Sequence, residues 1–210
     1  MNARFLTAAL LVALPAAAPG QTVEITPLVG YRVGGSFATA AGTDSDVTIS
    51  EYEVEDAASF GVQLGFRVSR DGEIEVLYAR QNTRLATDGL FTGAPLFDLA
   101  LETWHAGGNY LFAEEDSRVR PYIGMGLGVT RLLPEPAGLR DETRFSASFA
   151  AGAKVWLGRH VGLRVEARGF FTFLESDRET FCQTGEGCRV HAEGSEISQG
   201  ELRAGLVLRF

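Results

Sequence analysis

Beyond its first 20 positions, the sequence lacks any run of about 18 consecutive apolar residues, which a membrane-spanning helix would need. A helical membrane protein is therefore excluded. The chain also lacks an excess of basic residues, because 19 Lys and Arg stand against 27 Asp and Glu, giving a formal net charge of −8. An acidic chain is poorly suited to phosphate backbones, so we expect no nucleic acid among its partners.

Residues 1–20 have the pattern of a secretory signal peptide. Arg4 supplies the positive start, Phe5–Leu14 the apolar run, and Ala16–Gly20 a cleavage region of small residues. The apolar run is too short to span a membrane as a helix. We therefore expect an exported protein whose mature part is a single domain over residues 21–210.

The chain is rich in Gly (25) and Phe (14), and apolar and polar residues alternate along it repeatedly. Glycine is unfavourable in helices, whereas Phe favours strands. Alternation over segments of about ten residues indicates strands with two different faces. The sequence predicts eight of them: Val23–Gly35, Ala58–Ser69, Glu73–Leu85, Phe97–Phe112, Arg120–Arg131, Thr143–Leu157, Val161–Phe173 and Ile197–Phe210.

The connections between these segments alternate in length. Short connections are predicted at residues 70–72, 113–117 and 158–160. Long polar connections are predicted at Ser36–Asp56, Ala86–Leu96, Leu132–Glu142 and Leu174–Glu196. Short turns at one rim and long loops at the other are typical of an outer-membrane barrel. An even number of strands places both ends of the barrel domain at the short-turn rim.

The last strand shows how the two faces differ. Its apolar face carries Leu202, Ala204, Leu206, Leu208 and Phe210. Its other face carries Glu201 and Arg203, with Val207 as the apolar exception. A soluble lipocalin-like barrel, with its apolar face inside, is the alternative. Polar-face residues such as Gly126 and Ser146 are too small and too sparsely charged for a solvated exterior, so they favour a crowded polar lumen inside a membrane barrel.

A family resemblance rests on three features beside the alternation: the strand Pro121–Gly128 (PYIGMGLG), the strand Leu163–Arg168 (LRVEAR) and the terminal Phe210. Together they resemble the small eight-stranded bacterial outer-membrane β-barrel domain family of the OmpA/OmpX type. The resemblance covers residues 21–210. It implies an all-β, eight-stranded, antiparallel up-and-down transmembrane β-barrel in the bacterial outer membrane.

The resemblance also implies partners. These are outer-membrane lipids including lipopolysaccharide, and the barrel-assembly machinery, which would recognise the C-terminal strand with Phe210 as its assembly signal. It implies a monomer. It says less about function, because family members serve as anchors, adhesion surfaces or enzymes. The peptidoglycan-binding domain that OmpA carries has no counterpart after Phe210, so we do not expect that anchoring role.

Charged residues share the predicted inward face. The predicted lumen charge network consists of Arg32, Arg67, Glu75, Lys154, Arg164, Glu166, Arg168, Glu201 and Arg203. Buried charges need partners or water. We interpret the set as a salt-bridge plug, with a proton or ion path as the alternative. An eight-stranded barrel is only wide enough for side chains, which disfavours an open pore.

Cys182 and Cys188 are the only cysteines, and both lie in the last long connection. Disulfides persist in exported proteins, so we expect these two residues to form one. Two thiolates with His191 and Glu193 could instead bind zinc, and free thiols are the remaining alternative. In the first long connection, Asp44 and Asp46 lack the spacing of a calcium motif. That segment is interpreted as a solvated acidic loop, with divalent bridging to lipopolysaccharide as the alternative.

The sequence offers little support for catalysis. His105, His160 and His191 are the only histidines, and none has a Ser or Asp at a spacing that proposes a triad. No motif matches the lipid-modifying barrel enzymes of the acyltransferase or deacylase type. We therefore expect a non-enzymatic barrel, without cofactor or metal, whose plugged polar lumen supports four long loops for surface contacts or envelope stability. A narrow transport or hydrophobic-ligand barrel, or a lipid-modifying enzyme, are the alternatives.

Overall fold

The computed structural model describes residues 22–41, 48–87, 95–114, 116–135, 141–174, 180–183, 186–190 and 196–210. In this part of the chain there are twelve strands and no helix. The strands are β1 (Val23–Val33), β2 (Ser36–Ala41), β3 (Thr48–Val54), β4 (Ala57–Arg67), β5 (Gly72–Thr87), β6 (Pro95–Leu111), β7 (Val119–Pro134), β8 (Glu142–Trp156), β9 (Val161–Phe173), β10 (Thr180–Gln183), β11 (Glu186–Val190) and β12 (Glu196–Arg209). None of the described segments is a helix of the length and apolar character that crossing a membrane requires.

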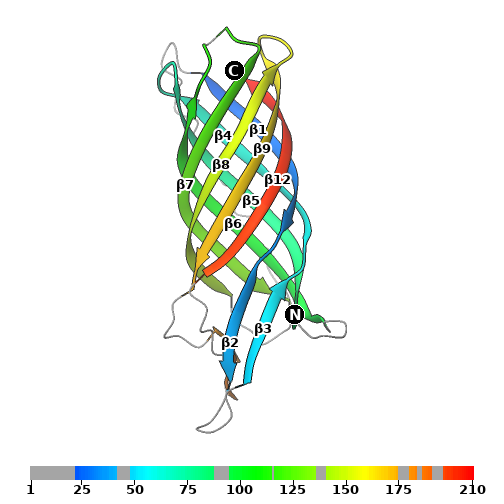
Figure 1. The fold of residues 1–210 in the computed structure, drawn as a ribbon. Coiled ribbons are helices and arrows are strands. Elements are labelled where there is room, and N and C mark those ends of the chain that lie inside the picture. The colour runs from blue at the N-terminus through cyan, green and yellow to red at the C-terminus, as the bar shows by residue number, and fades with distance from the viewer. Residues whose placement is uncertain are drawn as a thin grey trace, which may run out of the picture.

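Eight of these strands close into an antiparallel barrel (Figure 1). Around the ring the order is β1, β4, β5, β6, β7, β8, β9 and β12, and β12 pairs back with β1. The closing seam runs from Glu24 opposite Arg209 to Val33 opposite Gly200. Closure leaves no long strand edge in the barrel unpaired, as a membrane interior requires. The predicted fold class and all eight predicted strands are confirmed.

The two rims differ as predicted. Residues 68–71, 112–118 and 157–160 connect neighbouring barrel strands at one end, which we name the short-turn rim (at the top in Figure 1). Val23 and Phe210 meet there: the Val23 amide donates to the Phe210 carbonyl at 3.3 Å, and the Phe210 amide donates to the Val23 carbonyl at 2.9 Å. The opposite end is the long-loop rim.

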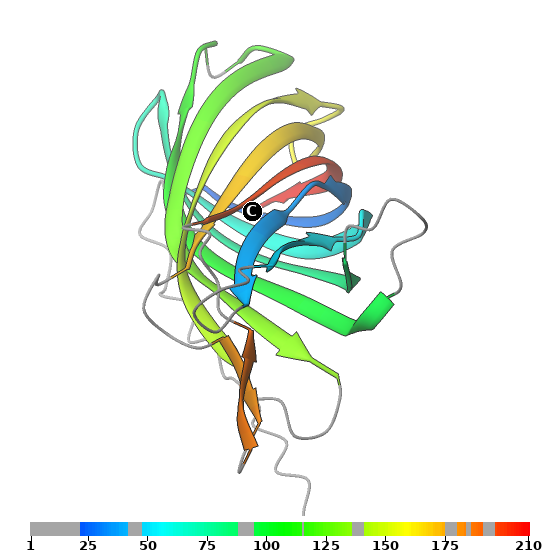
Figure 2. The same cartoon turned by 60° about the horizontal axis from the view of Figure 1, so that its bottom comes forward.

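Two segments that the sequence predicted as long loops contain strands. β2 and β3 form a hairpin within residues 36–56, and β10 and β11 form a second hairpin within residues 174–196. Gly34 and Gly35, with φ values of 79° and 117°, allow the chain to turn between β1 and β2. β3 then pairs with the end of β5, so the wall continues beyond the barrel at the long-loop rim (Figures 1 and 2).

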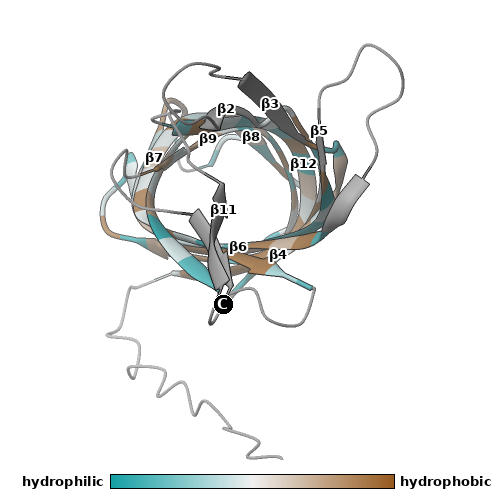
Figure 3. Ribbon diagram, turned by 90° about the horizontal axis from the view of Figure 1, so that it is seen from below, coloured by the Kyte–Doolittle hydropathy of each residue, from teal (hydrophilic) through white to brown (hydrophobic). Residues whose placement is uncertain are grey.

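Apolar side chains face outward and charged ones inward, which confirms the membrane orientation over the lipocalin-like alternative. Val29 and Leu202, for example, are 68% and 71% exposed, whereas Arg32 and Glu201, their neighbours in sequence on the opposite face, are buried. Hydrophobic and hydrophilic residues alternate along the strands in Figure 3. The aromatic residues near the short-turn rim, Tyr110, Phe112 and Phe210, are all on the exterior.

Candidate functional site

Glu166 is the centre of the charge network inside the barrel. It accepts hydrogen bonds from Arg164 at 2.6 Å, from Arg168 at 2.7 Å and from the Tyr122 hydroxyl at 2.6 Å. Arg203 lies opposite it in the β9–β12 register and forms an ion pair at 2.5 Å. Glu166 therefore binds guanidinium groups of its own strand and of the neighbouring strand.

Glu75 carries the network across the lumen. Its carboxylate is 2.6 Å from Arg168 Nη2 and 3.3 Å from Arg164 Nη2, and it also accepts hydrogen bonds from Gln63 and Asn109. Glu75 lies on β5, and both arginines lie on β9. In the eight-strand ring β5 and β9 are four places apart in either direction, so these ion pairs join opposite walls. The space between those walls is filled by paired side chains.

Lys154 forms a second crossing nearer the short-turn rim. Its ammonium group is 2.5 Å from both Glu24 on β1 and Glu73 on β5, although it projects from β8. Glu24 also pairs with Arg209 at 3.1 Å and Arg67 at 3.8 Å. The sequence analysis missed Glu24 and Glu73, which lie at the beginnings of their strands. The alternation that placed Glu75 inward assigns Glu73, two residues earlier, to the same face.

The nine predicted network residues all face the lumen. Arg32 pairs with Glu201 at 2.7 Å and places its guanidinium 4.0 Å from the centre of the Phe170 ring. Glu201 lies opposite Arg168 in the register but binds Arg32 instead. Arg120 is a further buried cation that the prediction omitted, and it donates to the backbone carbonyls of Arg70 and Ala113. The buried cations of the lumen thus lie beside buried carboxylates or backbone carbonyls, as burial in low dielectric requires.

His105 lies deeper in the lumen and contacts two serines that the sequence did not suggest. Its Nδ1 is 2.9 Å from Ser148 Oγ, and its Nε2 is 2.7 Å from Ser146 Oγ. Both serines project from β8, two strands away from His105 on β6, and are more than 40 residues away in sequence. Exposure is 3% for His105 and 0% for each serine. The described residues give this group neither a carboxylate partner for the imidazole nor an exposed path to a substrate.

An apolar cluster lies inside the barrel toward the long-loop rim. It consists of Val54, Leu85, Leu99, Leu101, Leu132, Leu174 and Ile197, each no more than 7% exposed. The sequence predicted a plugged polar lumen, and this apolar cluster was not predicted. The members that belong to barrel strands are at positions whose side chains face inward. Only the closed ring shows that these side chains lie at the same height along the barrel axis.

The predicted disulfide concerns side chains outside the described part of the structure. The backbone of the β10–β11 hairpin places Cys182 directly opposite Cys188. Directly opposite residues of an antiparallel pair have Cα separations that a disulfide can span. The disulfide therefore stays a prediction. Residues 1–20, Asp44, Asp46 and His191 also lie outside the described residues.

Comparisons with known proteins agree with this geometry. The model of the outer membrane protein beta-barrel domain family matches residues 5–210. The chain is similar to neisserial surface protein A (19% identity, 91% of this chain and 97% of that chain, TM-score 0.57). It is similar to OprG from Pseudomonas aeruginosa (11% identity, 90% of this chain and 95% of that chain, TM-score 0.67). It is also similar to the outer membrane protein AlkL (14% identity, 100% of this chain and 97% of that chain, TM-score 0.54). These identities support the fold alone, and no curated protein matches the chain.

Proposed function

The chain belongs to the outer membrane protein β-barrel domain family, and from that premise we propose that this bacterial outer-membrane protein is a non-enzymatic scaffold with a closed lumen. In this proposal the barrel presents its long connections at the outer face of the membrane. They serve surface contacts or envelope stability. The observation that carries the proposal is the pair of contacts from Glu75 to Arg164 and Arg168 across the full width of the barrel.

Two barriers in series support a closed lumen. The charge network around Glu166 occupies the half near the short-turn rim, and the apolar cluster around Leu101 and Leu132 occupies the half near the long-loop rim. An ion would have to break paired charges in the first and lose its hydration shell in the second. A side-chain-filled interior is also the expectation for eight strands.

Planar-bilayer recordings test the closed lumen directly. The protein, refolded until its unboiled and boiled forms migrate differently on SDS gels, is expected to give no steady conductance. A reproducible channel of uniform size would contradict the proposal. The scaffold role is tested in cells, where replacing residues 37–52 by a short turn, which keeps Val54 of the apolar cluster, should preserve the heat-modifiable barrel. It should nevertheless raise the sensitivity of the cells to detergent as much as deletion of the whole protein does.

The proposed partners follow from the same premise. Lipopolysaccharide would contact the outer half of the barrel wall, the assembly machinery would recognise the last strand, and the protein would act as a monomer. Phe210 is 72% exposed at the end of that strand, so its ring is available to a partner. Phe210→Ala is expected to lower the amount of protein in the outer membrane several-fold, while refolding in vitro is retained. Phe173→Ala, which removes an outward-facing phenyl ring of β9, is the matched control.

A hydrophobic-ligand barrel is the second candidate, and the apolar cluster favours it. A ligand would have to displace packed side chains such as Leu99 and Leu101, each 2% exposed. Saturable binding of a fluorescent alkane or fatty acid that is lost on Leu101→Gln would support this candidate over the scaffold. The buried position of His105 gives no comparable support to the lipid-modifying enzyme.

A further inference from the structure

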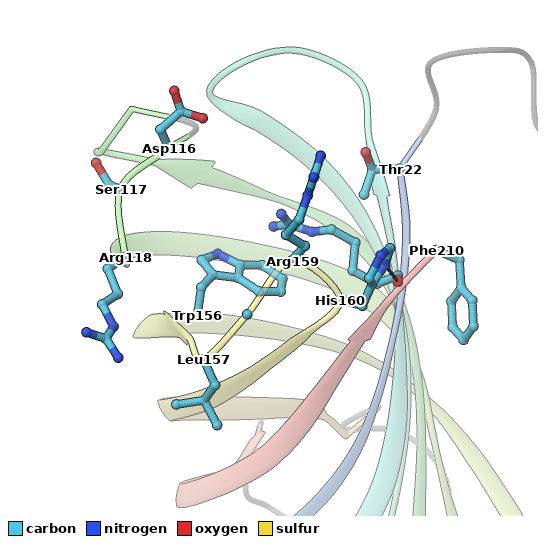
Figure 4. Close-up of a pocket in the computed structure, with 11 residues that line it drawn as sticks. Thr22, Asp116, Ser117, Arg118, Trp156, Leu157, Arg159, His160 and Phe210 are labelled. Atoms are coloured by element: carbon cyan, nitrogen blue, oxygen red, sulfur yellow. Dashed lines mark hydrogen bonds between the residues drawn. The ribbon is translucent and has the colours of Figure 1, made fainter.

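A hollow of about 720 Å³ lies at the short-turn rim, where Arg209 joins it to the charge network through Glu24. Its walls come from the turn 116–118, the segment 156–160 and the paired chain ends at Thr22, Arg209 and Phe210. Figure 4 shows Arg118 on one side, Arg159 and His160 on the other, and the Trp156 ring between them. The proposed scaffold function does not use this site.

The hollow is richer in cations than the chain as a whole. The sequence carries −8, yet the hollow is lined by the three guanidinium groups of Arg118, Arg159 and Arg209 against two carboxylates, those of Asp116 and of the chain end at Phe210. Arg118 and Arg159 are exposed, and within the described residues neither forms an ion pair. Two arginines without an ion-pair partner among the described residues therefore belong to the lining of the same hollow.

The third guanidinium is held in place. Arg209 stacks on the Trp156 ring, 3.3 Å from its centre, while its Nε and Nη2 donate to Glu24 at 3.2 and 3.1 Å. This leaves Nη1 as the donor available to the hollow. The Trp156 ring nitrogen is also buried without an acceptor among the described residues. A preorganised donor of this kind binds an anion at little cost in side-chain entropy.

His160 has a defined orientation as well. Its Nδ1 is 3.2 Å from the Arg209 carbonyl, and since a carbonyl oxygen only accepts, Nδ1 must carry the proton. The Arg209 amide in turn donates to the His160 carbonyl at 2.8 Å. The imidazole is thereby fixed in orientation, with Nε2 as an acceptor. The donors that suit a phosphate group are the guanidinium groups, the Trp156 ring nitrogen and the Ser117 hydroxyl.

We propose that this hollow binds the phosphate group of a phospholipid in the periplasmic leaflet of the outer membrane. The lipid source follows from the edge of the hollow, where Leu157 and Phe210 are 56% and 72% exposed on the lipid-facing wall. Short turns lie on the periplasmic side of such barrels, at the level of the headgroups. The headgroup would contact the arginines while the acyl chains follow the apolar exterior beneath it.

Trp156 provides a built-in reporter. The chain has two Trp residues, so Trp104→Phe leaves Trp156 as the only one. The full-length Trp104→Phe protein is refolded in maltoside micelles, which contain no phosphate, and titrated with short-chain phosphatidylglycerol. We expect a saturable change in Trp emission. Inorganic phosphate and glycerophosphate, titrated in parallel, are expected to bind at least about tenfold more weakly because they lack the apolar contacts.

Two variants decide the assignment. Arg118→Gln with Arg159→Gln should weaken lipid binding by at least about tenfold. Arg70→Gln, which changes an exposed arginine of the same rim outside the hollow, should leave binding within about twofold of the parent. All three substitutions are in exposed turns, so heat-modifiable migration is expected to be retained and is checked. An absent titration signal, equal weakening by Arg70→Gln, or inorganic phosphate binding as tightly as the lipid would each overturn the proposal.

Discussion

Glu75 and Arg168 project from opposite walls of the barrel, and their carboxylate and guanidinium groups are 2.6 Å apart at its centre. Each is buried, and each has further partners: Arg168 also binds Glu166, and Glu75 also binds Arg164. Because burial makes an unpaired charge costly, such a network is sensitive to the loss of any one member.

Glu166→Gln is expected to destabilise the barrel by about 3–5 kcal/mol, because three guanidinium groups lose their shared carboxylate in a confined space. Unfolding by urea in lipid vesicles, followed by Trp emission, measures the effect. Glu114→Gln, in an exposed turn, is the matched control and should change the free energy of unfolding by less than about 0.5 kcal/mol. Equal stability of the two variants would show that the network is hydrated rather than buried.

The two barriers of the lumen should act independently. Removing the cross-lumen pair with Glu75→Ala and Arg168→Ala is expected to leave the protein non-conducting, because the apolar cluster still closes the other half. Adding Leu101→Ser and Leu132→Ser should then produce steady conductance in planar bilayers. Heat-modifiable migration verifies folding of each variant. Conductance from the charge variant alone would mean that the apolar cluster is no barrier.

Cys182 and Cys188 are expected to be oxidised in the exported protein. Reduction should raise the intact mass by about two hydrogens, and a thiol reagent should label nothing beforehand. The opposed register of the two residues in β10 and β11 makes their linkage geometrically direct. Ready alkylation of the unreduced protein would contradict the prediction.

Two glycines give a matched test of wall packing. A Cβ at Gly107 would collide with the backbone carbonyl of Met125, which a rotamer change cannot relieve, whereas a Cβ at Gly158 would meet nothing within 4 Å. Gly107→Ala is therefore expected to lower the free energy of unfolding by about 1–3 kcal/mol. Gly158→Ala should have little effect in the same urea titration, and a similar loss in both would contradict the packing argument.

The sequence predicted the barrel well because membrane and lumen impose opposite chemistry on alternate residues. Arg164, Glu166 and Arg168 are spaced by two, so their common face follows from strand geometry alone. The register that places Arg203 opposite Glu166 comes from the structure. Glu73 was missed for a different reason, since it lies at the start of its strand, where little alternation precedes it.

Contacts that cross the lumen could not be predicted from the alternation of residues along the sequence. The pairing of His105 with Ser146 and Ser148 depends on the stagger of strands that are not neighbours, and no local spacing encodes it. Leu99 and Leu101 are at the positions of β6 whose side chains face inward. They are apolar, however, and the sequence assigned the polar face of each strand to the lumen. The level at which such residues meet is set by the closed ring.

The seam between β1 and β12 has a consequence for the order of assembly. β1 is the first barrel strand made and β12 the last, so the ring cannot close until the whole domain has been synthesised. Until then, groups on opposite walls such as Glu75 and Arg168 cannot be confined together, and their charges remain hydrated. Desolvation and pairing must therefore coincide with closure. We expect an all-or-none final step, with open-sheet intermediates that expose a charged inner surface to water.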